Sequence, residues 1–189
     1  MYKGVLRGTD LHQILSPYEP QKECLVRGHK VPSWGTQPFG YDVRLDPNEF
    51  LVFTNIFGGT TDPRNFDERS VTQVVQPKLD DDMLSYLIIP PNGTALGVTI
   101  ETFTMPDDVL GMVFGKSTYS RCGLVINCTI IEPGWRGRLV MELHNASPVP
   151  IKVYADGGIA QIIFIRGEEP LCPYDGKYQD QGGLVRPHV

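Results

Sequence analysis

The stretch from Gly115 to Asn145, GKSTYSRCGLVINCTIIEPGWRGRLVMELHN, is rich in residues that favour β-strands. Two apolar runs within it, Leu124 to Ile131 and Arg138 to Leu143, have the length of strands. The dipeptide Pro133-Gly134 between them is a breaker that is typical of a turn. The stretch therefore predicts two strands with a turn between them.

Short β-prone runs continue on both sides of this stretch, and many of the chain's 16 prolines and 20 glycines separate them. This spacing predicts an all-β fold, either a sandwich or a barrel. The further strands are expected at Gly40 to Leu45, Glu49 to Ile56, Leu84 to Ile89, Thr94 to Phe103, Val109 to Phe114, Ile151 to Val153 and Ile159 to Ile165.

One short N-terminal helix is expected from Thr9 to Leu15, because its first residues can cap a helix and its apolar residues recur with helical spacing. The dipeptide Ser16-Pro17 is expected to end it. The chain has 189 residues and 41% hydrophobic content, which is typical of one soluble domain, and no linker or repeat divides it. We therefore expect a single domain over residues 1–189.

Composition excludes several classes of partner. The formal net charge of −5 and the sequence pI near 5.3 argue against a general surface for nucleic acid or for an anionic membrane. No apolar run reaches the length of a membrane span, and Met1 to Arg7 lacks the apolar core of a signal peptide. We expect a cytoplasmic protein whose polyanionic ligands, if any, are small and bound locally.

Two cations and two hydroxyls follow Gly115 within six residues: Lys116, Ser117, Ser120 and Arg121. Such a group beside a turn suits a phosphate-bearing ligand. The same residues are also common as ordinary surface cations and as turn or cap residues. From the isolated segment both interpretations stay open.

Glu142 interrupts the apolar run of the last strand in the stretch. Strand alternation puts Val140, Glu142 and His144 on one face, opposite the face of the apolar residues between them. A carboxylate among apolar neighbours can have a raised pKa that suits acid/base catalysis. The alternative is that Glu142 points to water beside Arg138.

The chain contains no zinc-deaminase signature. Its cysteines, Cys24, Cys122, Cys128 and Cys172, form no C-x-x-C pair and are expected to be free, mostly buried thiols. Zinc-dependent deaminases need H-x-E and P-C-x-x-C motifs, and neither occurs here. A hydrolytic reaction on this chain would therefore have to activate water with a protein carboxylate. The run Asp80 to Asp82 is expected to be a solvated loop, since consecutive residues rarely converge on one ion.

Six segments, in order, closely resemble the motifs of the dCTP deaminases, within the dUTPase-like superfamily. They are Gly115 to Leu124, Glu132 to Gly137 and Val140 to Asn145 in the centre, Gly40 to Leu45 before them, and Gly158 to Gln161 and Gly176 to Gly183 after them. Several motifs in order are more specific than any one of them. The resemblance implies a distorted jelly-roll or β-barrel of the dUTPase-like type with a short N-terminal helix.

The resemblance implies a zinc-independent hydrolysis of dCTP to dUTP and ammonia, in pyrimidine deoxynucleotide metabolism. In it Glu142 shuttles protons, while Ser117 and Arg121 lie near the reacting end of the nucleotide. The loop of Lys116, Thr118, Tyr119 and Ser120 is implied to hold the phosphates. Mg²⁺ is expected on the triphosphate, and no metal is expected on the protein itself.

Further substrate contacts follow from the resemblance. Glu132 is implied to contact the deoxyribose and Trp135 to stack against it, although tryptophan is also a common core residue. Backbone groups around Ile130, Ile131, Val140 and Met141 are implied to bind the base edge. The residues implied to reach the triphosphate are Gln161, Tyr174, Lys177 and Gln181. Residues 174–189 are expected to order as a lid over the nucleotide.

Two rival functions stay open. The short turn from Gly123 to Glu132 resembles that of dUTPases, so a dUTPase or a bifunctional dCTP deaminase and dUTP diphosphatase is possible; the C-terminus, however, lacks the dUTPase phosphate motif. A dUTPase-like nucleotide-binding regulator without turnover is the third reading. The family also implies a homotrimer, with the loop from Ser117 to Arg121 and Glu142 from different chains in one site, and dTTP as an inhibitor.

Overall fold

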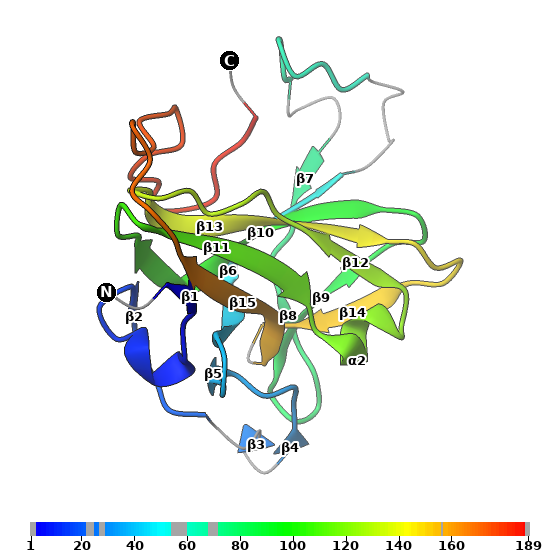
Figure 1. Ribbon diagram of the computed structural model, residues 1–189. Coiled ribbons are helices and arrows are strands. Elements are labelled where there is room, and N and C mark those ends of the chain that lie inside the picture. The colour runs from blue at the N-terminus through cyan, green and yellow to red at the C-terminus, as the bar shows by residue number, and fades with distance from the viewer. Residues whose placement is uncertain are drawn as a thin grey trace.

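Strands make up most of the fold, which is described here from a computed structural model (Figure 1). The structure describes residues 3–21, 25–26, 29–53, 60–67, 72–155 and 157–187. The expected thiol of Cys24 lies outside these residues. The ten-stranded main sheet has the order β1-β15-β6-β10-β13-β12, and β11 pairs with β15, β2 with β10, and both β5 and β7 with β6.

The elements of the main sheet and those beside it follow the chain. The first half contains β1 (Gly4–Val5), the 3-10 helix η1 (Gly8–Asp10), β2 (Leu15–Ser16), β5 (Gly35–Thr36), β6 (Tyr41–Phe53) and β7 (Thr72–Val74). The second half contains β10 (Thr94–Thr104), β11 (Val109–Gly115), the helical turn α2 (Ser117–Ser120), β12 (Leu124–Asn127), β13 (Arg136–Asn145) and β15 (Gly158–Arg166). Smaller sheets pair β3 (Leu25–Val26) with β4 (His29–Lys30), and β9 (Ser85–Ile89) with both β8 (Lys78–Leu79) and β14 (Ile151–Tyr154).

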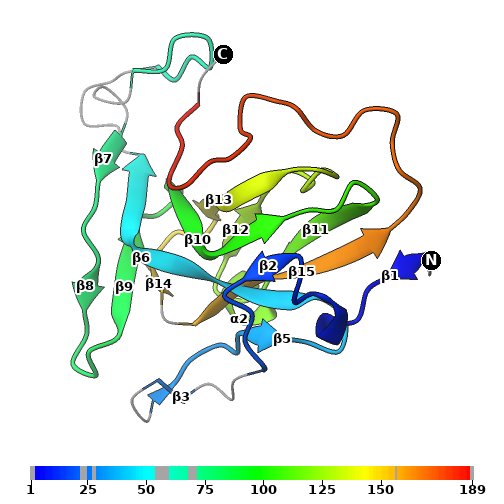
Figure 2. The ribbon, with the colours of Figure 1, turned by 90° about the vertical axis from the view of Figure 1, so that its left-hand side faces the viewer.

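The main sheet curls into a half-barrel around the hydrophobic core, as Figures 1 and 2 show together. Alternate residues of β6, Tyr41, Val43 and Leu45, are fully buried on its inner side. Phe103 of β10 packs its ring against Phe164 of β15 in the same core. The all-β prediction is therefore confirmed, because period-two burial along the long strands is what a sheet with one covered face requires.

The structure merges two predicted strands into one. Gly40 to Leu45 and Glu49 to Ile56 were expected to be separate, but β6 continues without a break to Phe53. Its register against β10 shifts between the pairs Thr99–Leu45 and Gly97–Phe50, which leaves a bulge over residues 46–49. A bulged residue makes no ladder hydrogen bond, so Pro47, which has no backbone N–H, is tolerated there and the strand continues past it.

The short N-terminal helix is present with different bounds. It is η1 (Gly8–Asp10), followed by hydrogen-bonded turns in which the Ile14 and Leu15 amides donate to the Leu11 carbonyl. The expected end at Leu15 is wrong, since this residue pairs with Phe103 of β10 as part of β2. Pairing with a long strand thus outweighs the helical spacing at this point. In the part of the chain that the structure describes, no helix has the length and apolarity needed to span a membrane.

The opening stretch folds as two paired strands, with two departures from expectation. Residues 117–120 form one helical turn, and the strand expected from Leu124 to Ile131 ends at Asn127. Ile131 then forms an isolated bridge with Gly111 of β11. β13 is longer than expected and pairs with β10 along its length and with β12 over its last four residues.

Candidate active site

A cavity of about 460 Å³ lies between the middle of β13, the segment after β12 and the C-terminal segment. Eight of the residues predicted to act on or bind the substrate line it: Ile130, Ile131, Glu132, Trp135, Val140, Glu142, Tyr174 and Gln181. The other lining residues are mostly apolar and include Leu96, Leu139 and Val185. One hollow therefore combines two carboxylates with apolar walls.

Glu142 lies half-buried on the cavity side of β13, as strand alternation predicted. Its neighbours Met141 and Leu143 are fully buried on the other face. Burial raises the pKa of Glu142, and a hydrogen bond from the Asn127 amide, 3.0 Å from Oε2, opposes that rise. The carboxylate is thus only partly solvated, and no cation among the described residues contacts it, which is a state that suits a proton carrier.

Cys128 forms the wall beside Glu142. Its thiol donates to the Val140 carbonyl across 3.6 Å. Burial, together with the charge of Glu142, raises the pKa of this thiol to about 12. Cys128 is therefore neutral near pH 7 and brings no second charge to the carboxylate.

The far end of the cavity is formed by the turn that carries Glu132 and Trp135. Glu132 lies directly before the turn that the sequence predicted at Pro133-Gly134, and its side chain is exposed. The Trp135 indole is buried against Phe103, yet it also lines the cavity and donates from Nε1 to the Tyr178 carbonyl across 2.8 Å. Trp135 therefore fits both interpretations that the sequence left open.

The C-terminal segment, residues 174–187, runs along the start of β13 and forms part of the cavity wall. Gln181 pairs with Gly137 in a parallel bridge, and its amide donates to the Arg138 carbonyl across 2.7 Å. Gly137 has φ of +144°, and a Cβ there would lie 2.8 Å from the Gln181 carbonyl oxygen, so only glycine allows this close approach. Lys177 is exposed, with its ammonium over the Tyr178 ring, and does not line the cavity.

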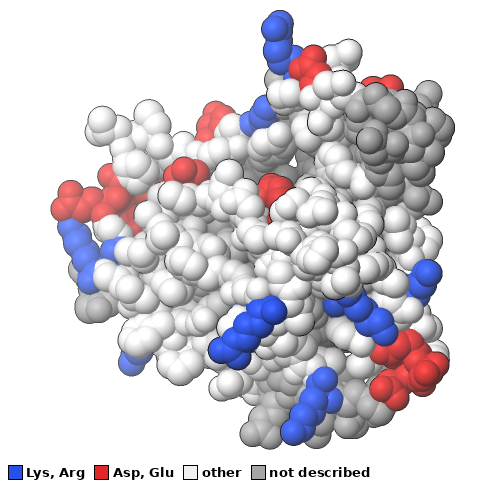
Figure 3. Space-filling model, turned by 90° about the vertical axis from the view of Figure 1, so that its right-hand side faces the viewer, with Lys and Arg blue, Asp and Glu red and all other residues white. Residues whose placement is uncertain are grey.

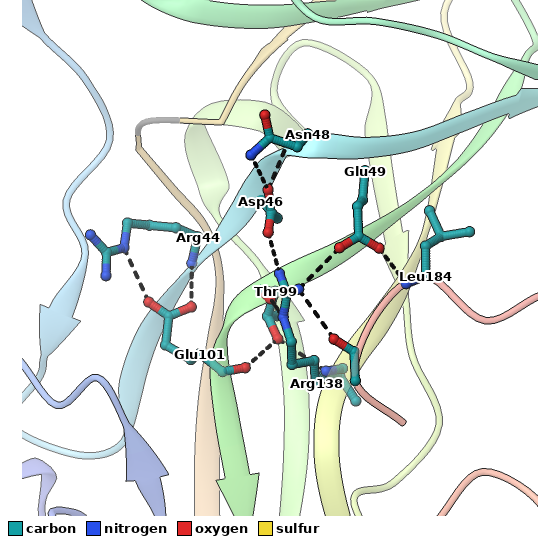
Figure 4. A network of polar contacts seen from close by, with 10 residues as sticks. Arg44, Asp46, Asn48, Glu49, Thr99, Glu101, Arg138 and Leu184 are labelled. Atoms are coloured by element: carbon teal, nitrogen blue, oxygen red, sulfur yellow. Dashed lines mark hydrogen bonds and ion pairs between the residues drawn. The ribbon is translucent and has the colours of Figure 1, made fainter. Parts of the chain in front are cut away.

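Arg138 holds this segment to the bulge of β6 (Figure 4). Its guanidinium donates to Asp46 Oδ2 at 2.6 Å, to Glu49 Oε1 at 3.1 Å and to the Gly182 carbonyl at 3.3 Å. The other oxygen of Glu49 accepts the Leu184 amide at 2.7 Å. Burial alone would raise the pKa of Asp46, but the hydrogen bonds from Asn48 and Arg138 outweigh it and lower the pKa.

Figure 4 also shows that Thr99 connects Arg138 to a second ion pair, in which the fully buried Glu101 carboxylate accepts from the Arg44 backbone amide and from Arg44 Nε. Burial raises the pKa of Glu101, and Arg44 opposes the rise. Neither residue lines the cavity. This pair therefore belongs to the sheet interior and not to the site.

Lys116 is engaged inside the chain. Its ammonium contacts the Asp42 carboxylate and donates to Ser33 Oγ at 2.9 Å. Burial raises the pKa of Asp42, and the Lys116 charge opposes it. Tyr119 is buried as well; its hydroxyl accepts the Tyr154 amide at 3.1 Å, and burial raises its pKa to about 12. These two side chains support the position of α2.

The other predicted residues of this region face solvent: Ser117, Thr118, Ser120 and Arg121. Gln161 is partly buried and donates to the Phe39 carbonyl across 2.9 Å. Within one chain, none of these residues lines the cavity in the described structure, and Met141 points away from it. The structure thus divides the predicted site into a cavity half around Glu142 and an α2 half.

Asn127 and Cys128 are site residues that sequence reasoning missed. Both were placed inside a predicted strand, and only the register of β12 against β13 puts Asn127 opposite Glu142. No motif marks them. Across the described ranges, no group of three or more His, Cys, Asp or Glu side chains is arranged to hold a metal ion.

Several known proteins are similar to this chain. The family model for dCTP deaminase-like proteins matches residues 21–167. A dCTP deaminase of Acidovorax sp. (strain JS42) is 42% identical over 189 residues, which cover 98% of this chain and 96% of that protein. A dCTP deaminase of Campylobacter concisus (strain 13826) is 45% identical over 166 residues, which cover 86% of this chain and 84% of that protein.

Among solved structures, the 2'-deoxycytidine 5'-triphosphate deaminase from Agrobacterium tumefaciens is similar with a TM-score of 0.58 and 16% sequence identity. The match covers 88% of this chain, which spans about half (48%) of that protein. At this identity the likeness concerns the fold alone, and it agrees with the half-barrel described above.

Proposed function

Because the chain belongs to the dCTP deaminase-like family, we propose that it catalyses the hydrolysis of dCTP to dUTP and ammonia, as a cytoplasmic enzyme of pyrimidine deoxynucleotide metabolism. One structural observation supports the proposal independently of the family relationship. Glu142 stands half-buried in an apolar-walled cavity, where burial raises its pKa. A carboxylate in such surroundings can accept a proton from water and later return it.

The reaction needs one water and one proton carrier. Ionised Glu142 takes a proton from water while the water oxygen bonds to C4 of cytosine. Protons then pass to N3 and to the amino group, which leaves as ammonia when its bond to C4 breaks. Ser117 and Arg121 would position the water and stabilise the polar intermediate.

The remaining contacts follow the shape of the cavity. Glu132 at the rim suits a sugar hydroxyl, and Trp135 suits the flat face of the deoxyribose. Backbone groups of Ile130, Ile131 and Val140 would bind the base edge. Tyr174 and Gln181 lie at the cavity wall where the triphosphate would pass, with Mg²⁺ carried by the nucleotide. A pyrimidine deoxynucleoside triphosphate such as dTTP would share these sugar and phosphate contacts and compete.

We propose a homotrimer in which α2 of one chain completes the cavity of another. The division of the predicted residues between α2 and the cavity supports this arrangement. So do four exposed apolar residues on β11, on β12 and after it: Met112, Phe114, Val125 and Ile130. Figure 3 shows the side on which β12, β14 and α2 lie, and its centre is largely uncharged. A second copy that covered this surface would bury apolar area.

Incubating the purified protein with dCTP and Mg²⁺ tests the function directly. We expect dUTP and ammonia in equal amounts. Because Glu132 shares the cavity with Glu142, a bifunctional enzyme is the second candidate, and it would yield dUMP and pyrophosphate instead. A Glu132→Gln variant that then accumulated dUTP would decide for the bifunctional enzyme. Release of neither ammonia nor pyrophosphate would overturn both.

A further inference from the structure

Asn127 is the last residue of β12 and lies directly opposite Glu142 in the antiparallel ladder. Side chains that are directly opposite in such a pair project to the same side of the sheet and can touch. Here they do, because Asn127 Nδ2 donates to Glu142 Oε2 across 3.0 Å. The next residue, Cys128, holds the Val140 carbonyl in the same way. The end of β12 thus contacts both the carboxylate and the backbone beside it.

The other groups around Glu142 show what the Asn127 amide contributes to the carboxylate. On β10, the residue opposite Glu142 is the apolar Leu96. Across the cavity lie the Glu132 carboxylate and the phenols of Tyr174 and Tyr178. His144, two residues along β13, is exposed and contacts Thr94 Oγ1 at 3.2 Å. The neutral Cys128 thiol completes the set, so in the described structure the Asn127 amide is the side-chain hydrogen-bond donor that contacts the carboxylate.

We propose that Asn127 is a positioning residue of the deamination: its amide holds Oε2 of Glu142 and thereby directs the proton transfers through the other oxygen, Oε1. This inference rests on the function proposed above. An amide that donates to a carboxylate limits the rotation of that carboxylate and favours its ionised form. Limited rotation keeps the carboxylate oriented toward the attacking water, and the ionised form is the one that can accept the proton.

The sign of the expected pH effect follows from this contact. Glu142 must be ionised to take a proton from water, so turnover rises with pH through its pKa. Removing the amide takes a donor from the ionised form, which raises the pKa and moves the acid limb of the pH–rate profile to higher pH. Asn127→Asp keeps the size but places a second carboxylate beside the first, so it is expected to move the limb further.

The test compares Asn127→Ala and Asn127→Asp with wild type and with Asn48→Ala. Asn48 is a matched control, because its amide also donates to a carboxylate at 3.0 Å, but that carboxylate, Asp46, does not line the cavity as Glu142 does. For Asn127→Ala we expect kcat to fall about tenfold near pH 7, KM to change less than about threefold, and the acid limb to rise by about one pH unit. Asn48→Ala is expected to leave the limb where it is.

A second readout does not depend on activity. Infrared or ¹³C NMR titration of glutamate-labelled protein, with Glu142→Gln to assign the signal, measures the Glu142 pKa in the free protein. We expect the pKa to be higher in both Asn127 variants than in wild type. An unchanged titration would overturn the proposal, as would lost activity that is explained by a lower melting temperature in both variants. If wild type released no ammonia from dCTP, the proposed function would fail, while the titration would still report on the Asn127 contact.

Discussion

The ionised form of Glu142 is costly for the folded chain. Its side chain stands among apolar cavity walls, burial raises its pKa, and the one amide of Asn127 opposes the rise only in part. When the pKa of a carboxyl group is higher in the folded than in the unfolded chain, the folded chain loses stability as pH rises above the pKa of that group in the unfolded chain. Residues kept in such surroundings are frequently functional ones, since function and stability make opposite demands there.

Glu142→Gln separates these two demands. We expect turnover of dCTP to fall by about two orders of magnitude or more, because the amide has the size of the carboxyl but cannot carry the proton. At pH 8 the melting temperature is expected to equal or exceed that of wild type, and the difference is expected to vanish below the ordinary pKa of glutamate. Glu169→Gln, at an exposed glutamate outside the cavity, is the control for both assays. Ammonia release close to wild type would remove Glu142 from the mechanism.

If a carboxylate activates the water, the activity should not depend on zinc. Activity is expected to survive treatment with a zinc-selective chelator once Mg²⁺ is added back, because the proposed mechanism uses Glu142 in place of a metal-bound water. Ammonia release from dCTP before and after treatment is the measurement. Loss that only Zn²⁺ restores would contradict the mechanism.

At the scale of single residues, the sequence predicts what depends on near neighbours. The face of β13 that carries Glu142 follows from alternation alone and is confirmed. Lys116 shows the limit: beside Ser117 it suggested a phosphate site, yet its ammonium contacts Asp42, 74 residues away along the chain. Asn127 shows the same limit, because its contact depends on a register that no local pattern encodes. The substrate contacts themselves stay predictions.

At the scale of elements, two arginines of β13 tie down the C-terminal segment in different ways. Arg136 makes a two-point contact with Asp180, but the two side chains are 52% and 60% exposed. Arg138 and its partner Asp46 are 15% and 19% exposed, and Glu49 and Gly182 share the guanidinium. Exposed pairs contribute little to stability, whereas removing one partner of a shielded network leaves a carboxylate without its cation.

Arg138→Gln and Arg136→Gln form a matched pair for this element. We expect Arg138→Gln to cost about 2 to 3 kcal/mol, somewhat less than for a fully buried pair, and to lower the melting temperature by several degrees. Limited proteolysis is expected to cut residues 174–187 faster, and the KM for dCTP to rise. Arg136→Gln is expected to change these quantities little. Equal effects of the two variants would show that shielding does not decide the role of Arg138.

The elements themselves were predictable where apolar alternation is long and uninterrupted. β10, β13 and β15 lie where the sequence placed them, with ends shifted by a few residues. β6 was divided in two because Asp46-Pro47 is a local breaker, and its pairing with β10 on both sides of the bulge overrides that signal. The expected strand past Asn127 failed for the opposite reason, since the chain leaves β13 there to reach Gly111 of β11.

At the scale of the whole molecule, one chain does not bring α2 to its own cavity. If sites form between chains, an Arg121→Ala chain and a Glu142→Gln chain, each nearly inactive, are expected to complement each other. Mixed trimers refolded from equal amounts would regain ~one quarter of wild-type activity. In one site out of four, Glu142 comes from an Arg121→Ala chain and Arg121 comes from a Glu142→Gln chain. Ammonia release, with the oligomer confirmed by light scattering, is the measurement.

The control for this mixing is a pair that cannot complement. Glu142→Gln mixed with the double variant Glu142→Gln/Arg121→Ala is expected to stay inactive, because every site then lacks Glu142. Absence of recovery in confirmed mixed oligomers would mean that each chain forms its own site. The order of the motifs in the sequence predicted the fold, but the proposed assembly would use exposed surface residues such as Phe114, which no local pattern marks.

The pairing of Gln181 with Gly137 also bears on how the protein avoids aggregation. β12 covers only the last four residues of β13, and the C-terminal segment supplies hydrogen bonds along the start of that same edge, from Arg136 to Arg138. An uncovered strand edge is a template for pairing with another chain. Each full opening of the segment to admit a nucleotide would bare such an edge. If the segment opens to admit a nucleotide, an opening that leaves Asp180 and Gln181 paired with β13 would keep this edge covered.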